Sequence, residues 1–275
     1  MPKSMIDTSI RKYFFVVRDL YAYFSFTRRS ATRRFRGVYS SYNAALAAVP
    51  RKALQGFEHQ SVAQFFVDTH FVFNPSDYPI LFWLSRIWEP GQLLFDFGGG
   101  VGQSFYVYQD YLRFPEGTRW LLYDLETLVE SGKRVALEKK AKGLEFTTDF
   151  QDAKGAAILL TTGALQYIEP DLSALIAELP EAPKHVLINR VPMYTGETYY
   201  SVQHSEHSFV PNKIMNMDAF VRGMERLNYE KVDEWYLPRS IRVPFHPECF
   251  VPSYHGFYFR LKGNGGNPQA LTDAI

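Results

Sequence analysis

The sequence predicts an α/β protein in which a mostly parallel sheet carries helices on both faces. The first observation is an apolar run, Leu93–Phe97, that leads into a glycine-rich turn. A buried parallel strand ends in this way where a ligand must approach bare backbone. The second is the alternation of short apolar runs with helix-like segments from Gln92 onwards. The third is that the last two apolar runs follow each other with no helix between them.

The length and composition set limits on the architecture. The 275 residues, of which 46% are hydrophobic, suffice for one such domain with an appendage. Neither a signal peptide nor a stretch of about 18 uncharged apolar residues is recognisable, so no membrane span is expected. The single cysteine, Cys249, fits a reducing compartment. We therefore expect a cytoplasmic protein.

The first 36 residues carry most of the positive charge. They hold nine Lys and Arg residues against two Asp, interleaved with aromatic side chains. We expect a basic-aromatic helix here that packs on the main domain with its arginines in solvent. The alternative is a helix that contacts an anionic membrane at its inner face. Nucleic acid is not expected as a partner, because no recognised binding module accompanies the charge.

Three short helices are predicted before the sheet begins. Asn43–Val49 has Ser40 or Ser41 as a cap, and Phe57–Phe71 and Tyr78–Trp88 follow it. The predicted division is a helical N-terminal region packed beside or over the main domain, the main domain itself, and a flexible Gly/Asn-rich tail. These parts comprise residues 1–90, 91–262 and 263–275.

The main domain is expected to alternate strands with helices. The predicted strands are Leu93–Phe97, Trp120–Tyr123, Leu144–Thr147, Ala156–Leu160, His185–Asn189, Lys231–Tyr236 and His255–Leu261. The predicted helices are Gln103–Leu112, Leu125–Lys142, Asp171–Leu179 and Asp218–Leu227. A long loop is expected between the fifth strand and the last helix.

The turn after the first strand carries the most specific motif. Asp96 precedes three glycines at alternate positions, Gly98, Gly100 and Gly102. A dinucleotide fingerprint would need G-x-G-x-x-G, which this spacing does not give. The pattern resembles motif I of the class I S-adenosylmethionine-dependent methyltransferases. The resemblance implies S-adenosylmethionine as the cofactor and a Rossmann-like seven-stranded sheet whose last strand is antiparallel.

Further acidic residues stand at the ends of neighbouring strands. Asp124 ends the second strand, where a carboxylate can accept both ribose hydroxyls, although it could also cap the following helix. The resemblance assigns an adenine contact to Asp149 with the neighbouring Phe150, and a solvated loop acid is the alternative. The expected cofactor-binding residues are Asp96, Gly98, Gly99, Gly100, Gly102, Asp124, Leu125, Asp149, Phe150 and Thr162.

The segment after the fifth strand is expected to carry the acceptor chemistry. O-methylation favours a base with a pKa near 7, and His204 or His207 is the candidate. Tyr167, Tyr194 and Tyr199 are expected to bind the acceptor, because phenols combine stacking with hydrogen bonding. A metal site formed by His204, Glu206 and His207 is an alternative that lacks standard ligand spacing, so no metal is expected.

A wider resemblance covers most of residues 35–260. Phe35–Tyr42, Leu122–Leu125, Gly163–Tyr167 and Leu187–Arg190 resemble a family of methyltransferases encoded among bacterial surface-polysaccharide genes. The resemblance implies an O-methyltransferase that acts on a sugar hydroxyl of a surface polysaccharide or glycan precursor. The alternatives are N- or C-methylation of a small molecule, and a non-catalytic cofactor-binding scaffold for glycan enzymes.

Overall fold

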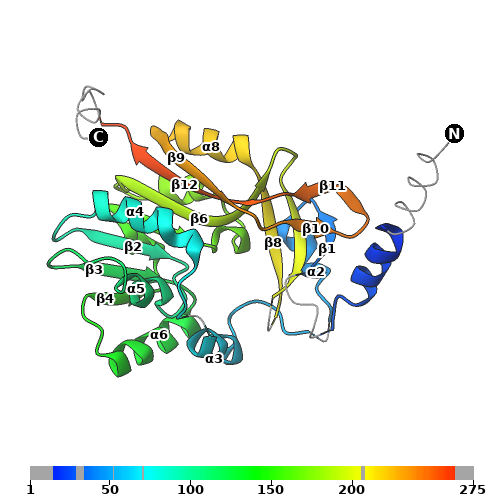
Figure 1. Cartoon of the computed structure of the whole chain (residues 1–275), viewed down its shortest axis with the longest axis horizontal. Coiled ribbons are helices and arrows are strands. Elements are labelled where there is room, and N and C mark those ends of the chain that lie inside the picture. Colours follow the sequence, from blue (N-terminus) through cyan, green and yellow to red (C-terminus); the bar gives the residue numbers. More distant parts are fainter. Residues whose placement is uncertain (1–14, 29–33, 52, 70, 206–207, 264–275) are drawn as a thin grey trace.

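A computed structural model describes residues 15–28, 34–51, 53–69, 71–205 and 208–263 of the chain. Its centre is a twisted sheet flanked by helices, and an additional β layer lies beyond the carboxyl ends of the parallel strands (Figure 1). The predicted α/β class is confirmed.

Seven strands form the predicted sheet. They are β2 (Leu93–Phe97), β3 (Arg119–Tyr123), β4 (Leu144–Thr147), β5 (Ile158–Thr162), β6 (His185–Tyr194), β9 (Tyr229–Leu237) and β12 (Tyr254–Leu261). The strand order is β4-β3-β2-β5-β6-β12-β9, with the first five parallel. Strand β12 runs antiparallel to both β6 and β9. This is the strand order of the class I methyltransferase fold, with the predicted antiparallel strand in place.

Helices cover both faces of this sheet. Helices α4 (Tyr78–Ile87) and α5 (Gln103–Tyr108) bury their apolar residues against one face. Helices α7 (Leu172–Ala177) and α8 (Met217–Arg226) cover the other face together with the 3-10 helix η3 (Phe150–Ala153). Alternate residues of β2 therefore enter different cores, because neighbouring side chains of a strand point to opposite faces. Asp96 faces the α4–α5 side, and Phe95 and Phe97 face the other.

The segment expected to be a long loop is instead an additional β layer. Strand β6 continues beyond the sheet to Tyr194, and β7 (Tyr199–His204) and β8 (Phe209–Asn216) follow it. Strand β7 pairs with β8 and with β1 (Arg34–Tyr39), both antiparallel, and the end of β6 pairs with β8. The hairpin of β10 (Ile241–Val243) and β11 (His246–Val251) packs on this layer through a shared apolar cluster.

The N-terminal region differs from the prediction because it is not entirely helical. Residues 15–24 form a helix, and α2 (Tyr42–Ala47), α3 (Gln60–Thr69) and α4 correspond to the expected helices. Between the first two lies β1, whose hydrogen bonds to β7 tie this region into the sheet. None of the helices described is long and apolar enough to cross a membrane. Residues 1–14, and the predicted tail from residue 264 onwards, lie outside the described part.

Candidate functional site

The glycine turn lies at the carboxyl end of β2, between that strand and α5. Gly98 and Gly100 have φ values of 71° and 64°, and Gly102 has a φ of 99° at the start of α5. A side chain would be strained in this left-handed region, which explains the need for glycine. The Gly98 N–H donates to the Tyr123 carbonyl at 2.8 Å, so the turn is held against the end of β3.

Asp96 is fully buried directly beneath this turn. Its Oδ2 accepts a hydrogen bond from Trp120 Nε1 at 3.0 Å. Its Oδ1 is buried and has no hydrogen-bond partner within the described part of the chain. A Cβ placed on Gly99 would lie 2.6 Å from Oδ2, so only a glycine lets the backbone pass over the carboxylate. Burial raises the pKa of Asp96 to about 7, although the Trp120 hydrogen bond opposes this change.

Asp124 approaches the same turn from the end of β3. Its Oδ2 accepts from the Gly100 N–H at 2.7 Å, and its Oδ1 accepts from the Leu125 N–H at 2.7 Å. Burial raises the pKa of Asp124 to about 6, and the two backbone hydrogen bonds lower it. The two carboxylates thus meet the glycine turn from adjacent strands. Such a pair suits a ligand that carries a cation at one end and hydroxyl groups at the other.

The other predicted cofactor residues lie at the ends of β4 and β5. Asp149 is exposed, and its Oδ1 accepts from the Gln151 N–H at 2.9 Å, which caps η3. The Phe150 ring makes edge contacts with the rings of Phe97 and Tyr123, at centroid distances of 5.8 and 6.0 Å. Thr162 is the last residue of β5. Their roles in binding stay predictions.

Helix α3 covers the glycine turn from the N-terminal region. Ala63 on α3 is fully buried against Val101 of the turn and Leu128 of α6 (Glu126–Lys139). Helix α3 is therefore in contact with both the glycine turn and α6. The contact removes one side of the turn from water.

The three predicted acceptor tyrosines do not lie together. Tyr167 lies in η4 (Leu165–Tyr167), just after β5, and its hydroxyl donates to Gln203 Oε1 at 3.2 Å. Tyr199 is buried in the core of the additional β layer, where its hydroxyl donates to the Cys249 carbonyl at 2.8 Å. The Tyr194 hydroxyl donates to a backbone carbonyl in the turn before β7. Of these three tyrosines, Tyr167 is therefore the one that lies next to the carboxyl end of β5.

His204 is part of strand β7 and not of a loop. Its Nδ1 lies 2.9 Å from the Phe26 carbonyl, and its ring stacks on Phe209 at a centroid distance of 4.2 Å. A carbonyl oxygen only accepts, so Nδ1 carries the proton. Burial lowers the pKa of His204, while the hydrogen bond raises it. These contacts fit a structural role better than that of a base. His207, the second candidate, lies outside the described residues.

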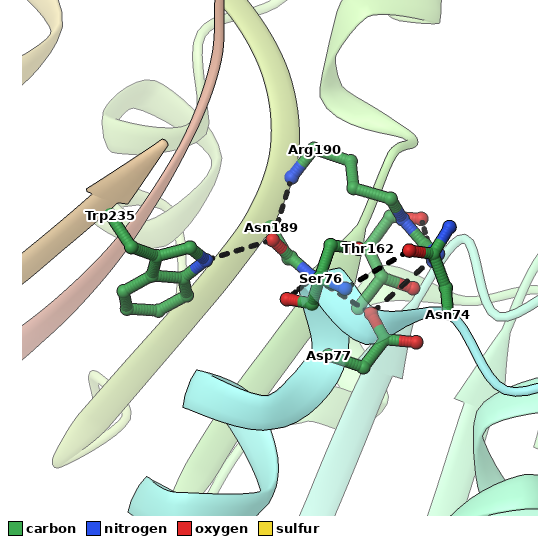
Figure 2. Close-up of polar contacts among 7 residues, drawn as sticks. All are labelled: Asn74, Ser76, Asp77, Thr162, Asn189, Arg190 and Trp235. Atoms are coloured by element: carbon green, nitrogen blue, oxygen red, sulfur yellow. Dashed lines mark hydrogen bonds and ion pairs between the residues drawn. The ribbon is translucent and has the colours of Figure 1, made fainter. Parts of the chain in front are cut away.

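A polar network in the middle of β6, beside the carboxyl end of β5, was given no role by the sequence analysis (Figure 2). It contains Asp77, from the 3-10 helix η2 (Pro75–Asp77) that leads into α4, together with Asn189 and Arg190 of β6. The Asn189 Nδ2 donates to Asp77 Oδ1 at 2.8 Å, and an Arg190 Nη atom lies 3.6 Å from the same oxygen. The sequence could have indicated this network, because Asn189 and Arg190 are polar residues at the end of the predicted strand His185–Asn189.

The described surface also has a groove of about 680 Å³ at the opposite end of the sheet. Its lining includes Thr118 and Gly143, which precede β3 and β4, and the basic side chains Arg113, Lys139 and Lys142. It is therefore separate from the glycine turn. Within the described ranges, no three His, Cys, Asp or Glu side chains are grouped so that they could hold a metal ion.

Comparisons with known proteins give likenesses to solved structures alone. No protein-family model matches the chain, and no curated protein matches its sequence. Among solved structures, the 1,6-didemethyltoxoflavin-N1-methyltransferase of Burkholderia thailandensis is 15% identical, with a TM-score of 0.46 over 74% of this chain and 88% of that one. The magnesium protoporphyrin IX methyltransferase of Synechocystis PCC 6803 is 12% identical, with a TM-score of 0.48 over 75% and 96%. The geranyl diphosphate C-methyltransferase of Streptomyces coelicolor A3(2) is 13% identical, with a TM-score of 0.49 over 78% and 90%. Because these identities and TM-scores are low, the fold is assigned from the order and direction of the strands and not from the superpositions on these structures.

Proposed function

We propose that this protein is an S-adenosylmethionine-dependent methyltransferase. The observation that carries the proposal is the pair of carboxylates at the glycine turn. The buried Oδ1 of Asp96 lacks a partner among the described residues and suits the α-ammonium of the cofactor. The Asp124 carboxylate, beside the Gly100 N–H, suits the ribose hydroxyls. These residues therefore fit the cofactor, which supplies a transferable methyl group when bound.

The residues around the turn contribute positioning and exclusion of water. Because a carboxylate oxygen has two lone pairs, Asp124 can accept from a ligand while it keeps its backbone donors. Ala63 closes the turn on the α3 side. Methyl transfer depends mainly on holding the two reactants in line in a dry site. The segments after β5 and β6 leave the same end of the sheet and are the proposed place for the acceptor.

A sugar hydroxyl of a surface polysaccharide or glycan precursor is the acceptor that we propose. Uncharged hydrogen-bonding groups support this choice. Beside η4, Gln203 Oε1 accepts from Tyr167 and from Asn212 Nδ2, the latter at 2.7 Å. Ser201 Oγ and Asn212 Oδ1 are buried without a partner in the described part of the chain. A hydroxyl-rich molecule suits such groups better than an apolar one does. N- or C-methylation of another small molecule is the alternative.

The general base stays a prediction. The contacts of His204 argue against this residue, so the proposal keeps His207 as the candidate. If neither histidine acts, positioning of the acceptor with a carboxylate such as Glu169 or Glu197 would have to suffice.

Calorimetry with S-adenosylhomocysteine and with NAD tests the proposal. The native protein should bind the former and not the latter. Asp124→Asn should weaken binding by about 10- to 100-fold, because a buried ribose hydroxyl loses a charged acceptor. Asp110→Asn changes an exposed residue just after α5 and serves as the control. Binding of NAD, or equal affinity in both variants, would contradict the proposal. Cofactor binding with no methyl transfer to any glycan or small-molecule acceptor would favour the non-catalytic scaffold.

We also propose that the protein contacts an anionic membrane peripherally through its N-terminal region. The helix at residues 15–24 is anchored to the β10–β11 turn, where the Phe245 N–H donates to Asp19 Oδ2 at 2.9 Å. The helix exposes apolar and aromatic residues, including Leu20 and Phe24, the latter 75% exposed. Arginines lie among these rings, such as Arg36 at 5.5 Å from the Tyr23 centroid. Exposed rings with basic side chains suit an anionic interface.

Point variants are the appropriate test of membrane contact. Deletion of residues 1–30 would also remove Phe26, which is fully buried and whose carbonyl is hydrogen-bonded to His204. We expect Leu20→Ser combined with Phe24→Ser to reduce sedimentation with phosphatidylglycerol vesicles. Leu137→Ser, which changes an 81% exposed residue on α6, is the control. Equal sedimentation of all three proteins would refute the proposal.

A further inference from the structure

A β-bulge distorts β6 at the edge of the candidate site. Ile188 pairs with Phe257 and Val191 pairs with His255, so two residues of β6 face Gly256 alone. A bulge of this kind redirects side chains and occurs often beside active sites. The second of the two residues, Arg190, has a φ of 60°, an unfavourable value for a residue with a side chain.

The surroundings of the bulge hold this distortion in place. A Cβ on Gly256 would lie 2.2 Å from the Trp235 ring, so the ring crosses the strand where glycine leaves room. The Trp235 Nε1 donates to Asn189 Oδ1 at 2.9 Å, and the Arg190 N–H donates to the same oxygen at 3.1 Å. The Asn189 Nδ2 donates to Asp77 Oδ1 and to the Ser76 carbonyl (Figure 2). Asn189 is thus fully engaged as a scaffold that orients Arg190.

The Arg190 guanidinium itself is much less engaged. One Nη atom lies 3.6 Å from Asp77 Oδ1 and the other 3.4 Å from the Thr162 carbonyl. Both distances exceed those of good hydrogen bonds. Its side chain is 26% exposed, whereas that of Asp77 is 7% exposed. A guanidinium offers five N–H donors in a planar fork, so this one can take a further anion while Asp77 fixes its orientation.

The position of Arg190 relates it to the glycine turn. A Cβ on Gly163, which follows β5, would lie 3.7 Å from the Arg190 side chain. The next residue, Ala164, would lie 2.3 Å from a Cβ on Gly98. The guanidinium is therefore next to the segment that packs against the turn. The charge of Arg190 lowers the pKa of Asp96, as expected for a neighbouring cation.

We propose that Arg190 binds the α-carboxylate at the amino-acid end of the cofactor, while Asp96 takes the α-ammonium of the same group. An α-amino acid presents these opposite charges side by side, and the site presents a guanidinium and a carboxylate in return. The inference rests on the proposed function, because it concerns the same cofactor. A carboxylate or phosphate of the acceptor would be bound by the same chemistry, and the experiment separates the two sources.

Calorimetry with two adenosine thioethers tests the inference. S-adenosylhomocysteine has the amino-acid end, and 5′-methylthioadenosine lacks it. Arg190→Gln should weaken binding of S-adenosylhomocysteine by about 10- to 100-fold and leave 5′-methylthioadenosine unchanged, because a hydrogen-bonded charge is lost only from the first ligand. Arg190→Lys keeps the positive charge but not the planar fork of N–H donors. Its affinity for S-adenosylhomocysteine should therefore lie between those of the native protein and Arg190→Gln. Arg119→Gln, at the opposite end of the sheet, is the control.

Each outcome separates this inference from the proposed function. Failure of the native protein to bind S-adenosylhomocysteine would refute both. Native binding that is unchanged in Arg190→Gln and Arg190→Lys would overturn the inference alone. Equal loss for both thioethers would also overturn it, because the effect would then be structural. If Arg190→Gln does not fold, Arg190→Lys is compared with the native protein instead. Weaker binding of S-adenosylhomocysteine with unchanged binding of 5′-methylthioadenosine would support the inference, and equal changes for both would overturn it.

Discussion

The buried carboxylate beneath the glycine turn should make the stability of this protein depend on pH in a measurable way. The pKa of Asp96 is raised from 3.8 to about 7 by burial. Between these values the folded state keeps a proton that the unfolded chain has lost. The Asp96 contribution to the free energy of unfolding is therefore at its highest below about pH 4 and decreases as the pH rises to 7. A difference of about three units between the pKa values of Asp96 in the folded and unfolded states corresponds to a change of about 4 kcal/mol in the free energy of unfolding.

Asp96→Asn replaces the carboxylate with a neutral group of the same shape. The amide oxygen can still accept from Trp120 Nε1, but the amide adds a buried donor, which costs about 1–3 kcal/mol at every pH. At pH 4 the variant should therefore be less stable than the native protein by this amount. At pH 8 the native protein holds a buried negative charge on Asp96, and the variant does not. The difference in unfolding free energy between the two proteins should thus change by about 4 kcal/mol in favour of the variant between pH 4 and 8.

Urea unfolding at several pH values measures this change directly. Subtracting the native curve removes the pH dependence of the groups that do not interact with Asp96. The same Asp96→Asn variant should lose affinity for S-adenosylhomocysteine at pH 8, because a neutral amide does not attract an ammonium. Native affinity should fall below about pH 7 for the same reason. A stability difference that does not vary with pH would refute this reasoning.

Three further predictions concern the residues of the candidate site. Gly99→Ala should destabilise the protein by about 1–3 kcal/mol and weaken cofactor binding, because the new methyl group would lie 2.6 Å from Asp96 Oδ2. Gly263→Ala, where a Cβ meets no atom within 4 Å, should have no effect in the same melting and calorimetry experiments. His204→Ala should lower stability by about 2–4 kcal/mol through loss of a buried ring. His207→Ala should lower turnover about 10²–10⁴-fold with cofactor affinity unchanged if it is the base, and a native rate would remove it from the mechanism.

The strands of the central sheet could be predicted because each is an apolar run that ends at a turn or an acid. The additional β layer could not be predicted in this way. Strands β7 and β8 bury polar residues on both faces, among them Gln203, Asn212 and Lys213. Lys213, for example, is buried because its Nζ donates to the Glu169 and Pro170 carbonyls and to Asp171. A pattern of alternating polarity predicts a strand only where one face meets water.

The candidate site could be predicted where it depends on local spacing and not where it depends on tertiary pairing. The motif around Asp96 and the acid at Asp124 are local features at the ends of consecutive strands. The hydrogen bond from Trp120 depends on the register of β3 beside β2, in which Leu94 pairs with Trp120. The conformation of Arg190 depends on the register between β6 and β12, which is distant in the sequence.

The N-terminal region completes the site and is more than an appendage. Ala63 covers the glycine turn, and Asp77 holds both Asn189 and Arg190 of β6. Burial raises the pKa of Asp77, while Arg190 and Asn189 lower it, so the charge of Asp77 relies on these partners. The dependence is mutual, because Asn189 without Asp77 would retain a buried donor with one fewer acceptor. A central sheet that lacked residues 1–90 would therefore keep the glycine motif but lose Asp77, the acceptor that holds Asn189 and Arg190.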